Sequence, residues 1–173
     1  DCLARYEAAG GIAINPARAI EAAVDKFLTS AKLQSAGLLT PRTIVCQTFE
    51  EAMQAFEELG GDVVVKPLFG SEGRGLIRLQ DSNLALRAFK MLSQLNAVLY
   101  VQQFIQHEGE DWRLLVLGEQ VYGMRRRNPL DWRTNVSRGA STSPLEVTPE
   151  LRELAQRAAA AVQAPIGGVD LLP

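Results

Sequence analysis

The chain has 173 residues, 47% of them hydrophobic and 22% charged, and its formal net charge is −2. This composition is typical of a folded globular protein, and the slightly acidic balance argues against a nucleic-acid partner. The sequence contains no apolar run long enough to cross a bilayer and no basic-then-apolar leader, and its two cysteines lie outside any metal or redox motif. We therefore expect a reduced, cytoplasmic protein without a membrane partner.

The first quarter of the chain contains the signals of a helix. Asn15 is a typical N-cap residue, and Pro16 suits the first helical position. Apolar residues then recur at helical spacing, at Ile20, Val24, Phe27 and Ala31. We expect one helix that ends at Gly37.

Strands and helices then alternate. β-branched residues predict short strands at 42–46 and 62–66, and Thr48 with Glu51 forms a capping box for the helix between them. After a glycine-rich loop, a strand resumes at 76–79. A third helix begins near Asp81, and it has an apolar face formed by Leu84, Ala88, Met91 and Leu95.

The last part of the chain is rich in strands. We expect strands at 98–105, 111–117 and 120–126, the last two joined by a type II′ turn at Gly118-Glu119. A long polar connection covers 128–146 and precedes a helix from Thr148 and a strand from Ile166. Adjacent strands beside helices indicate antiparallel α+β lobes rather than a regular βαβ winding.

The clearest candidate for chemistry is Lys66 with the loop that follows it, which consists of Gly70, Ser71, Glu72, Gly73, Arg74 and Gly75. The glycines let backbone N–H groups approach a phosphate chain, and the lysine adds a positive charge. A flexible hairpin tip with an exposed lysine would have the same residues. The known phosphate loops do not fit, because there is no G-K-[ST], the lysine precedes the glycines, and the loop returns to a strand instead of opening a helix.

Weaker candidates lie elsewhere in the chain. Lys26 lies on the first helix, Gln103-Phe104 end a strand, and Asp111 lies two residues before Arg113. The long polar connection contains Arg133, Asn135 and Arg138. Arginine holds a carboxylate or a transferring phosphoryl group in a fork, and an asparagine oxygen can be a neutral ligand of phosphate-bound Mg²⁺.

Taken in order, these pieces resemble the ATP-grasp superfamily and, within it, the RimK-like glutamate ligases. The matching stretches are AIEAAVDKFLT, VVVKPLFGSEGRG, YVQQFI, GEDWRLLVLG, DWRTNVSRG and GGVDLL, which span residues 17 to 172. The DWRTN form is most similar to the branch that adds glutamate to pterin or related cofactors. The resemblance implies an α+β ATP-grasp fold, in which two lobes with antiparallel sheets grip ATP.

The resemblance also implies a nucleotide site. Lys26 and Lys66 would contact the phosphates of ATP, and the loop from Gly70 to Gly75 would cover them as a lid. Gln103 and Phe104 would meet the adenine ring. Asp111 would lie on the ribose side.

A catalytic site is implied in the same way. Arg133, Thr134 and Asn135 would face the transferred phosphate and the acceptor carboxylate, and Arg138 would join the catalytic set. Asp170 would be the first ligand of Mg²⁺ or Mn²⁺. ATP would phosphorylate a carboxylate, on a small cofactor or a protein C-terminus, and the amino group of glutamate would attack the acyl phosphate to form an amide.

The family pattern divides the chain into three parts. Residues 1–15 would be the trailing edge of an N-terminal α/β domain, 16–106 the small lobe with its lid, and 107–173 the start of the large lobe. The N-terminal α/β domain and the C-terminal Glu-x-Asn metal motif of the family are missing from these 173 residues. We therefore expect this chain by itself to bind ATP weakly and to turn over poorly.

Three alternatives stay open at this point. The chain could belong to an ATP-grasp ligase of the dipeptide or D-alanine type, or to a non-catalytic nucleotide-binding module. An RNA-contacting domain would use Arg138 and the run 125–127, but the net charge argues against it, and such a run is typical of a solvated strand end. The sequence leaves the number of subunits open, homo-oligomers included.

Overall fold

The computed structural model describes residues 2–70 and 75–173, and their contacts form two compact units. Unit 1 comprises the residues up to Leu39 together with His107–Pro173, and unit 2 comprises Thr40–Gln106. The predicted division of the chain into three parts stays a prediction. Within unit 1, residues distant in sequence are in contact: the Arg157 guanidinium donates to the carbonyl of Ala36 at 2.9 Å.

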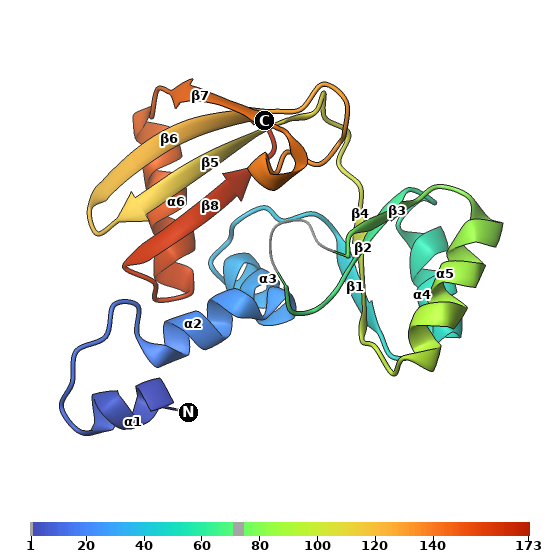
Figure 1. The fold of residues 1–173 in the computed structure, drawn as a ribbon, viewed down its shortest axis with the longest axis horizontal. Coiled ribbons are helices and arrows are strands. Elements are labelled where there is room, and N and C mark those ends of the chain that lie inside the picture. The colour runs from blue at the N-terminus through green and yellow to red at the C-terminus, as the bar shows by residue number, and fades with distance from the viewer. Residues whose placement is uncertain (1, 71–74) are drawn as a thin grey trace. The chain divides into compact units, whose positions relative to one another are not determined.

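Unit 2 contains an antiparallel sheet with the strand order β1-β4-β2-β3, packed against two helices (Figure 1). Its elements are β1 (Thr43–Cys46), α4 (Phe49–Glu58), β2 (Val63–Lys66), β3 (Ile77–Leu79), α5 (Ser82–Gln94) and β4 (Leu99–Gln103). The predicted capping box is present, since Glu51 N donates to the Thr48 hydroxyl at 3.2 Å and the Glu51 carboxylate accepts from Thr48 N at 3.3 Å. The Asp81 carboxylate caps α5 by accepting from Leu84 N at 2.9 Å.

The apolar face predicted for α5 is not the face that the helix buries. Phe89 is completely buried, whereas Leu84 and Met91 are 58% and 57% exposed. A phenylalanine ring removes a large apolar area from water, so the helix turns Phe89 and Ala85 toward the sheet. Of the predicted residues, Leu84, Met91 and Leu95 are exposed and only Ala88 packs against the core, so the buried face is rotated from the predicted one.

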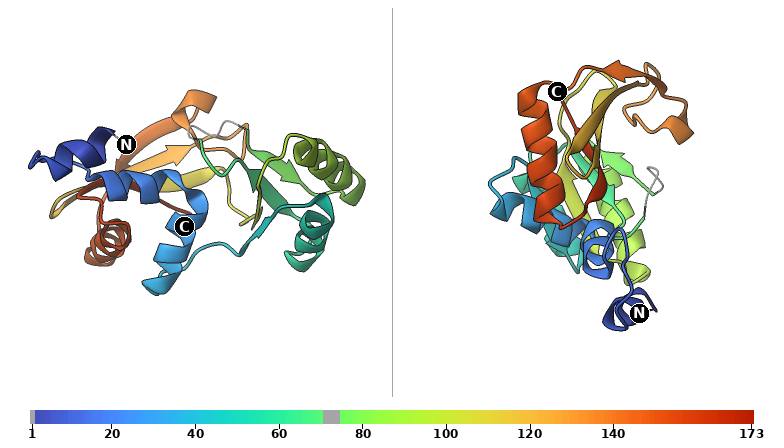
Figure 2. Two further views of the ribbon diagram at one scale, coloured as in Figure 1. Left: turned by 90° about the horizontal axis from the view of Figure 1, so that it is seen from below. Right: turned by 90° about the vertical axis from the view of Figure 1, so that its left-hand side faces the viewer.

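Unit 1 contains an antiparallel sheet with the strand order β7-β6-β5-β8, and α6 runs along one of its faces (Figures 1 and 2). Its elements are α1 (Cys2–Ala8), α2 (Ala17–Val24), α3 (Lys26–Ser35), β5 (Glu110–Leu117), β6 (Gln120–Arg127), the short 3₁₀ helix η1 (Val136–Arg138), β7 (Ser141–Leu145), α6 (Pro149–Ala161) and β8 (Ile166–Leu171). Leu114, Val116 and Val121 bury their side chains among the alanines of α6.

The β5–β6 hairpin turns at Gly118, whose φ of 59° is the left-handed value that a type II′ turn requires at its first central position. The strand β7 was not predicted. It lies in the connection that the sequence analysis treated as a loop, because its Ser, Thr and Pro residues are typical of loops. β7 forms through its backbone pairing with β6.

The single helix predicted from Asn15 is two helices in the structure. Asp25 has an extended backbone (φ −89°, ψ 107°), and its carboxylate starts α3 by accepting from Leu28 N at 2.9 Å. Asn15 does not cap α2. Its amide instead pairs with both backbone groups of Ile166, 151 residues away, at 2.6 and 2.9 Å.

No helix in the ranges 2–70 and 75–173 is long and apolar enough to cross a membrane.

Candidate active site

The face of the unit 1 sheet opposite α6 carries a group of charged side chains. Side chains alternate along a strand, so Asp111 and Arg113 point away from the face on which Leu114 packs against α6. The register places Arg126 opposite Asp111 and Asp170 opposite Arg113. Strand pairing thus gathers two aspartates and two arginines on the face of the sheet opposite α6.

These four residues form a connected network. Arg126, whose side chain is 3% exposed, donates through Nε to Asp111 at 2.7 Å and through Nη2 to the other Asp111 oxygen. The same Nη2 lies 3.1 Å from Asp170 Oδ1. Arg113 donates through Nε and Nη2 to the two oxygens of Asp170, both at 2.7 Å. We call Asp111, Arg113, Arg126 and Asp170 the charged network.

Burial of the Arg126 guanidinium acts to lower its pKa, but the hydrogen bonds and charges of Asp111 and Asp170 outweigh this effect and raise the pKa. Arg126 therefore keeps its positive charge inside the sheet. Asp111 is itself buried, with both oxygens engaged by Arg126, while Arg113 and Asp170 are 40% and 45% exposed. The predicted ribose contact of Asp111 stays a prediction, and in this arrangement its carboxylate orients Arg126.

The connection between β6 and β7 carries the predicted catalytic residues. Arg133 donates to the Asp131 carboxylate through Nε at 3.0 Å and Nη2 at 2.6 Å, and these hydrogen bonds lower the pKa of Asp131. The Arg133 guanidinium is thereby held in one direction. Thr134 is buried, and Asn135 is the N-cap of η1 without a side-chain capping bond.

Lys26 is the first residue of α3, because the chain breaks at Asp25. It therefore lies at a helix N-terminus, where the helix dipole favours anions. Burial lowers the pKa of Lys26, and the adjacent Asp25 carboxylate opposes this shift. Arg138, in the same unit, is the last residue of η1.

In unit 2, Lys66 ends strand β2 as predicted. Its Nζ donates to Gln102 Oε1 at 2.6 Å, and Gln102 Nε2 donates in turn to the Thr43 hydroxyl at 2.8 Å. Gln102 is buried on the central strand β4, and it therefore fixes the direction of the Lys66 ammonium. Gln102 was not predicted as a site residue.

The predicted adenine-contacting residues follow directly: Gln103 is the last residue of β4, and Phe104 comes after it. Gln103 N donates to the carbonyl of Arg42 at 2.8 Å, and Phe104 N donates to the carbonyl of Asp62 at 3.0 Å. The Arg78 guanidinium lies 3.4 Å from the Phe104 ring centroid and is held by Asp62 at 2.6 and 2.8 Å. One face of the Phe104 ring is therefore covered by Arg78.

The glycine-rich loop is described only at its ends. Gly70 and Gly75 have φ of 133° and 72°, values that favour glycine. The predicted site residues Ser71, Glu72, Gly73 and Arg74 lie outside the described residues. Their assignment to the lid stays a prediction.

The predicted metal ligand does not have a metal-binding environment. Asp170 already accepts hydrogen bonds from Arg113 and lies against Arg126, whereas a divalent cation such as Mg²⁺ prefers several oxygen ligands. Among the residues that the structure describes, no group of three or more His, Cys, Asp or Glu side chains could hold a metal ion. These residues do not fit a bound Mg²⁺ by themselves.

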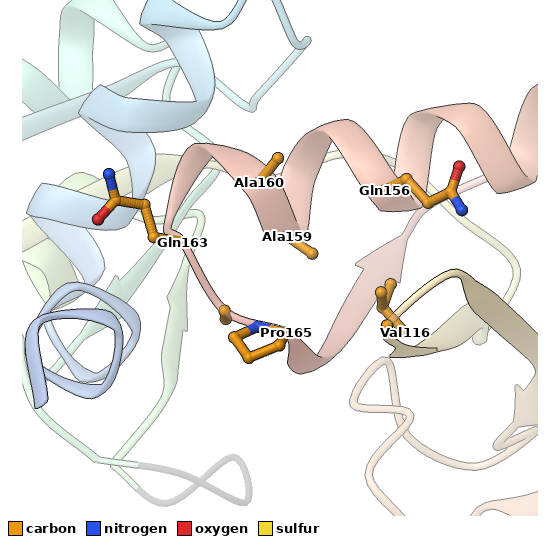
Figure 3. A pocket seen from close by; sticks show the side chains of 8 residues that line it. Val116, Gln156, Ala159, Ala160, Gln163 and Pro165 are labelled. Carbon is orange, nitrogen blue, oxygen red and sulfur yellow. The ribbon is translucent and has the colours of Figure 1, made fainter. Parts of the chain in front are cut away.

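A hollow of about 220 Å³ lies at the end of α6 (Figure 3). Its lining is mostly apolar and consists of Val116, Gly118, Gln156, Ala159, Ala160, Gln163, Ala164 and Pro165. Val116 packs on the α6 side of the sheet, so the hollow lies on the opposite face from the charged network. None of the predicted site residues lines it.

Arg126 is the functional candidate that sequence reasoning missed most clearly, since its run of arginines was interpreted as a solvated strand end. A signal was present. A two-residue turn at 118–119 pairs residue 117 with 120, and counting back along both strands pairs Asp111 with Arg126. The predicted hairpin therefore already placed a carboxylate opposite this arginine.

The two antiparallel sheets with their helices form the ATP-grasp fold. The chain superposes with a TM-score of 0.75 on the ATP-grasp ligase PsnB complexed with minimal precursor, Mg and ADP, with 27% sequence identity over 98% of this chain and 52% of that one. Residues 23–173 match the RimK-like ATP-grasp domain, and the chain belongs to this family.

Two curated relatives are similar over nearly the whole chain. The chain is 32% identical to the tetrahydromethanopterin:alpha-L-glutamate ligase of Methanosarcina acetivorans, over 99% of this chain and 57% of the relative. It is 34% identical to the glutamate–LysW ligase ArgX of Sulfurisphaera tokodaii, over 96% of this chain and 61% of the relative. The chain thus spans less than two thirds of the length of these relatives.

Proposed function

We propose that this chain supplies nucleotide-binding and phosphoryl-binding residues of an ATP-dependent carboxylate–amine ligase that adds L-glutamate to a carboxylate acceptor. The proposal rests on the match of residues 23–173 to the RimK-like ATP-grasp domain, together with the Lys66 ammonium that Gln102 holds at 2.6 Å at the end of β2. Two relatives named as glutamate ligases and a structural neighbour complexed with ADP and Mg support the choice of substrates.

The proposed reaction has two steps. An acceptor carboxylate oxygen attacks the γ-phosphorus of ATP, ADP leaves, and an acyl phosphate forms. The amine of glutamate then attacks the acyl carbon, phosphate leaves, and the nitrogen loses a proton to give the amide. Both steps place negative charge on phosphate oxygens, so positioned cations stabilise them.

The residues of the chain divide this work. Arg133 and Arg138 bind the transferred phosphoryl group, with Thr134 and Asn135 facing it, and arginine provides a planar fork of donors for this task. Lys26 contributes a positive charge and the N-terminus of α3 to phosphate binding. A divalent cation would arrive with the nucleotide and neutralise charge on its phosphates, but we assign it neither a ligand in this chain nor a step.

In unit 2, the proposal assigns Lys66 to the phosphates of ATP, the loop 70–75 to their cover, and Gln103 with Phe104 to adenine. Gln102 supports the role of Lys66, because its amide oxygen accepts from the ammonium at 2.6 Å and fixes the direction of the ammonium. A group held in place loses less freedom when it binds an anion.

Nucleotide binding by Lys66→Met tests the first half of the proposal. Hydrogen bonds to charged groups contribute about 1.5–3 kcal/mol, so calorimetric affinity for ATP should fall by roughly ten- to a hundredfold. Lys90→Met, in the same unit, is the matched control and should leave the affinity unchanged. Equal affinities of the parent chain and Lys66→Met would refute the assignment of Lys66.

ADP release with a panel of acceptors tests the second half, and it is measured on the full-length protein. The glutamate ligase predicts ADP release that requires both glutamate and a carboxylate acceptor. Release with two amino acids alone would favour the dipeptide or D-alanine type of ligase. ATP binding without ADP release under any combination would favour a non-catalytic module.

A further inference from the structure

The connection between β6 and β7 is organised by one buried side chain, Asn128, which is 5% exposed. Its Nδ2 donates to the carbonyl of Arg133 at 3.1 Å and to the carbonyl of Arg138 at 3.2 Å. Its Oδ1 accepts from Leu130 N at 3.2 Å. One amide thus binds the backbone at three points of the segment 130–138, and two of these points belong to proposed phosphoryl-binding arginines.

The backbone of Asn128 is also held, by a hydrogen bond to the residue that precedes strand β5. Asn128 N donates to the carbonyl of Gly109 at 2.8 Å. Gly109 has a φ of 70°, and a Cβ on it would lie 2.3 Å from the carbonyl oxygen of Asn128. The close approach of these two residues therefore requires glycine, and it anchors Asn128 at the start of strand β5.

The chemistry of the contact requires an asparagine. The side-chain amide has two N–H donors, and each one goes to a different carbonyl, while its oxygen takes the N–H of Leu130. An aspartate of the same shape would have no donor and would face two carbonyl oxygens with a carboxylate. A serine would keep a single, shorter donor.

We propose that Asn128 is a positioning residue, which holds the backbone of Arg133 and Arg138 so that their guanidinium groups extend from fixed backbone positions in the β6–β7 connection. This inference rests on the proposed function for its catalytic part, and on contacts of unit 1 alone for its structural part. Asn128 acts through the two arginines and does not contact the substrates.

The test compares Asn128→Asp with Asn128→Ser, and uses Asn83→Asp on the exposed start of α5 as the matched control. Hydrogen–deuterium exchange is measured across residues 129–139, together with ATP affinity, and kcat and KM for the acceptor. Asn128→Asp should speed exchange of this segment by roughly tenfold through the two lost hydrogen bonds. It should lower kcat by a similar factor and leave the ATP affinity and the exchange of β5 and β6 unchanged. The exchange rate and kcat of Asn128→Ser should lie between those of the parent and those of Asn128→Asp.

The outcomes separate the inference from the proposed function. Unchanged exchange in 129–139 overturns the inference outright. Faster exchange with an unchanged kcat shows a loop contact without a positioning role, and it also overturns the inference. If the full-length parent protein releases no ADP, the proposed function fails, and the positioning of the arginine backbones is decided by the exchange data alone. If Asn128→Asp does not fold, the exchange and kcat of Asn128→Ser decide instead.

Discussion

Removal of the Arg126 side chain should destabilise unit 1 far more than removal of the side chain of Arg125, the preceding residue in β6. Arg126→Met leaves Asp111 buried without its counter-charge, and breaking a buried ion pair from one side costs about 3–5 kcal/mol. Both tryptophans, Trp112 and Trp132, lie in unit 1. Urea unfolding followed by tryptophan fluorescence therefore reports the free energy of unfolding of this unit specifically.

The matched control is Arg125→Met, the same substitution one residue earlier in β6. Arg125 is 46% exposed, and its Nε lies 3.1 Å from a Glu110 oxygen, so its loss should cost less than about 1 kcal/mol. The double variant Arg126→Met/Asp111→Leu removes both buried charges and should recover much of the loss, with a coupling of about 2–3 kcal/mol. Equal losses for Arg126→Met and Arg125→Met would refute the reasoning that the buried network determines the stability of this sheet.

Three further predictions concern single side chains. Asp25→Ala removes the cap of α3 and should cost about 1 kcal/mol in urea unfolding, whereas Asp25→Asn should cost much less, and equal costs would contradict the capping role. Burial, and secondarily the Glu51 charge, raises the pKa of Cys46 to about 11. Near neutral pH, a disulfide reagent should therefore react at once with the exposed Cys2 and with Cys46 only after unfolding. Rapid reaction of both thiols in the folded chain would contradict this prediction. The pKa of Asp131 is lowered in the folded chain, so its contribution to stability is present above the unfolded pKa of about 3.9 and is lost as pH falls through the folded pKa. Asp131→Asn and the parent should therefore converge in stability in acid, and a difference that stays constant with pH would be inconsistent with the pair.

Local signals in the sequence were sufficient for many of the elements. The Thr48–Glu51 capping box, the Thr148 cap of α6 and the Gly118 turn each act within a few residues, so each could be predicted from a short stretch. The same is true of Lys66, which ends its strand as expected. These signals depend on backbone hydrogen bonds that close locally.

The failures share a physical cause, which is dependence on distant contacts. Asn15 has the composition signal of a cap, but its amide pairs with Ile166, and no local pattern shows a partner 151 residues away. The face of α5 is chosen by the sheet beneath it, where Phe89 packs better than Met91. Spacing predicted which residues share a face, and tertiary packing decided which face is buried.

The charged network depends on both local signals and distant contacts, so only the Asp111–Arg126 pair could be predicted from the sequence. The pairing of Asp111 with Arg126 follows from a hairpin whose turn can be predicted from the sequence. Asp170 lies on β8, and the pairing of β8 with β5 joins residues that are far apart in the sequence, so no local pattern predicts it. The two aspartates and two arginines balance in charge, so Arg126 can be buried at acceptable cost while Arg113 and Asp170 remain partly exposed. Asp170 completes this charge balance and therefore contributes to the stability of the sheet. Because its removal should lower stability, a test of Asp170 as a metal ligand must measure the free energy of unfolding of the variant as well as its activity.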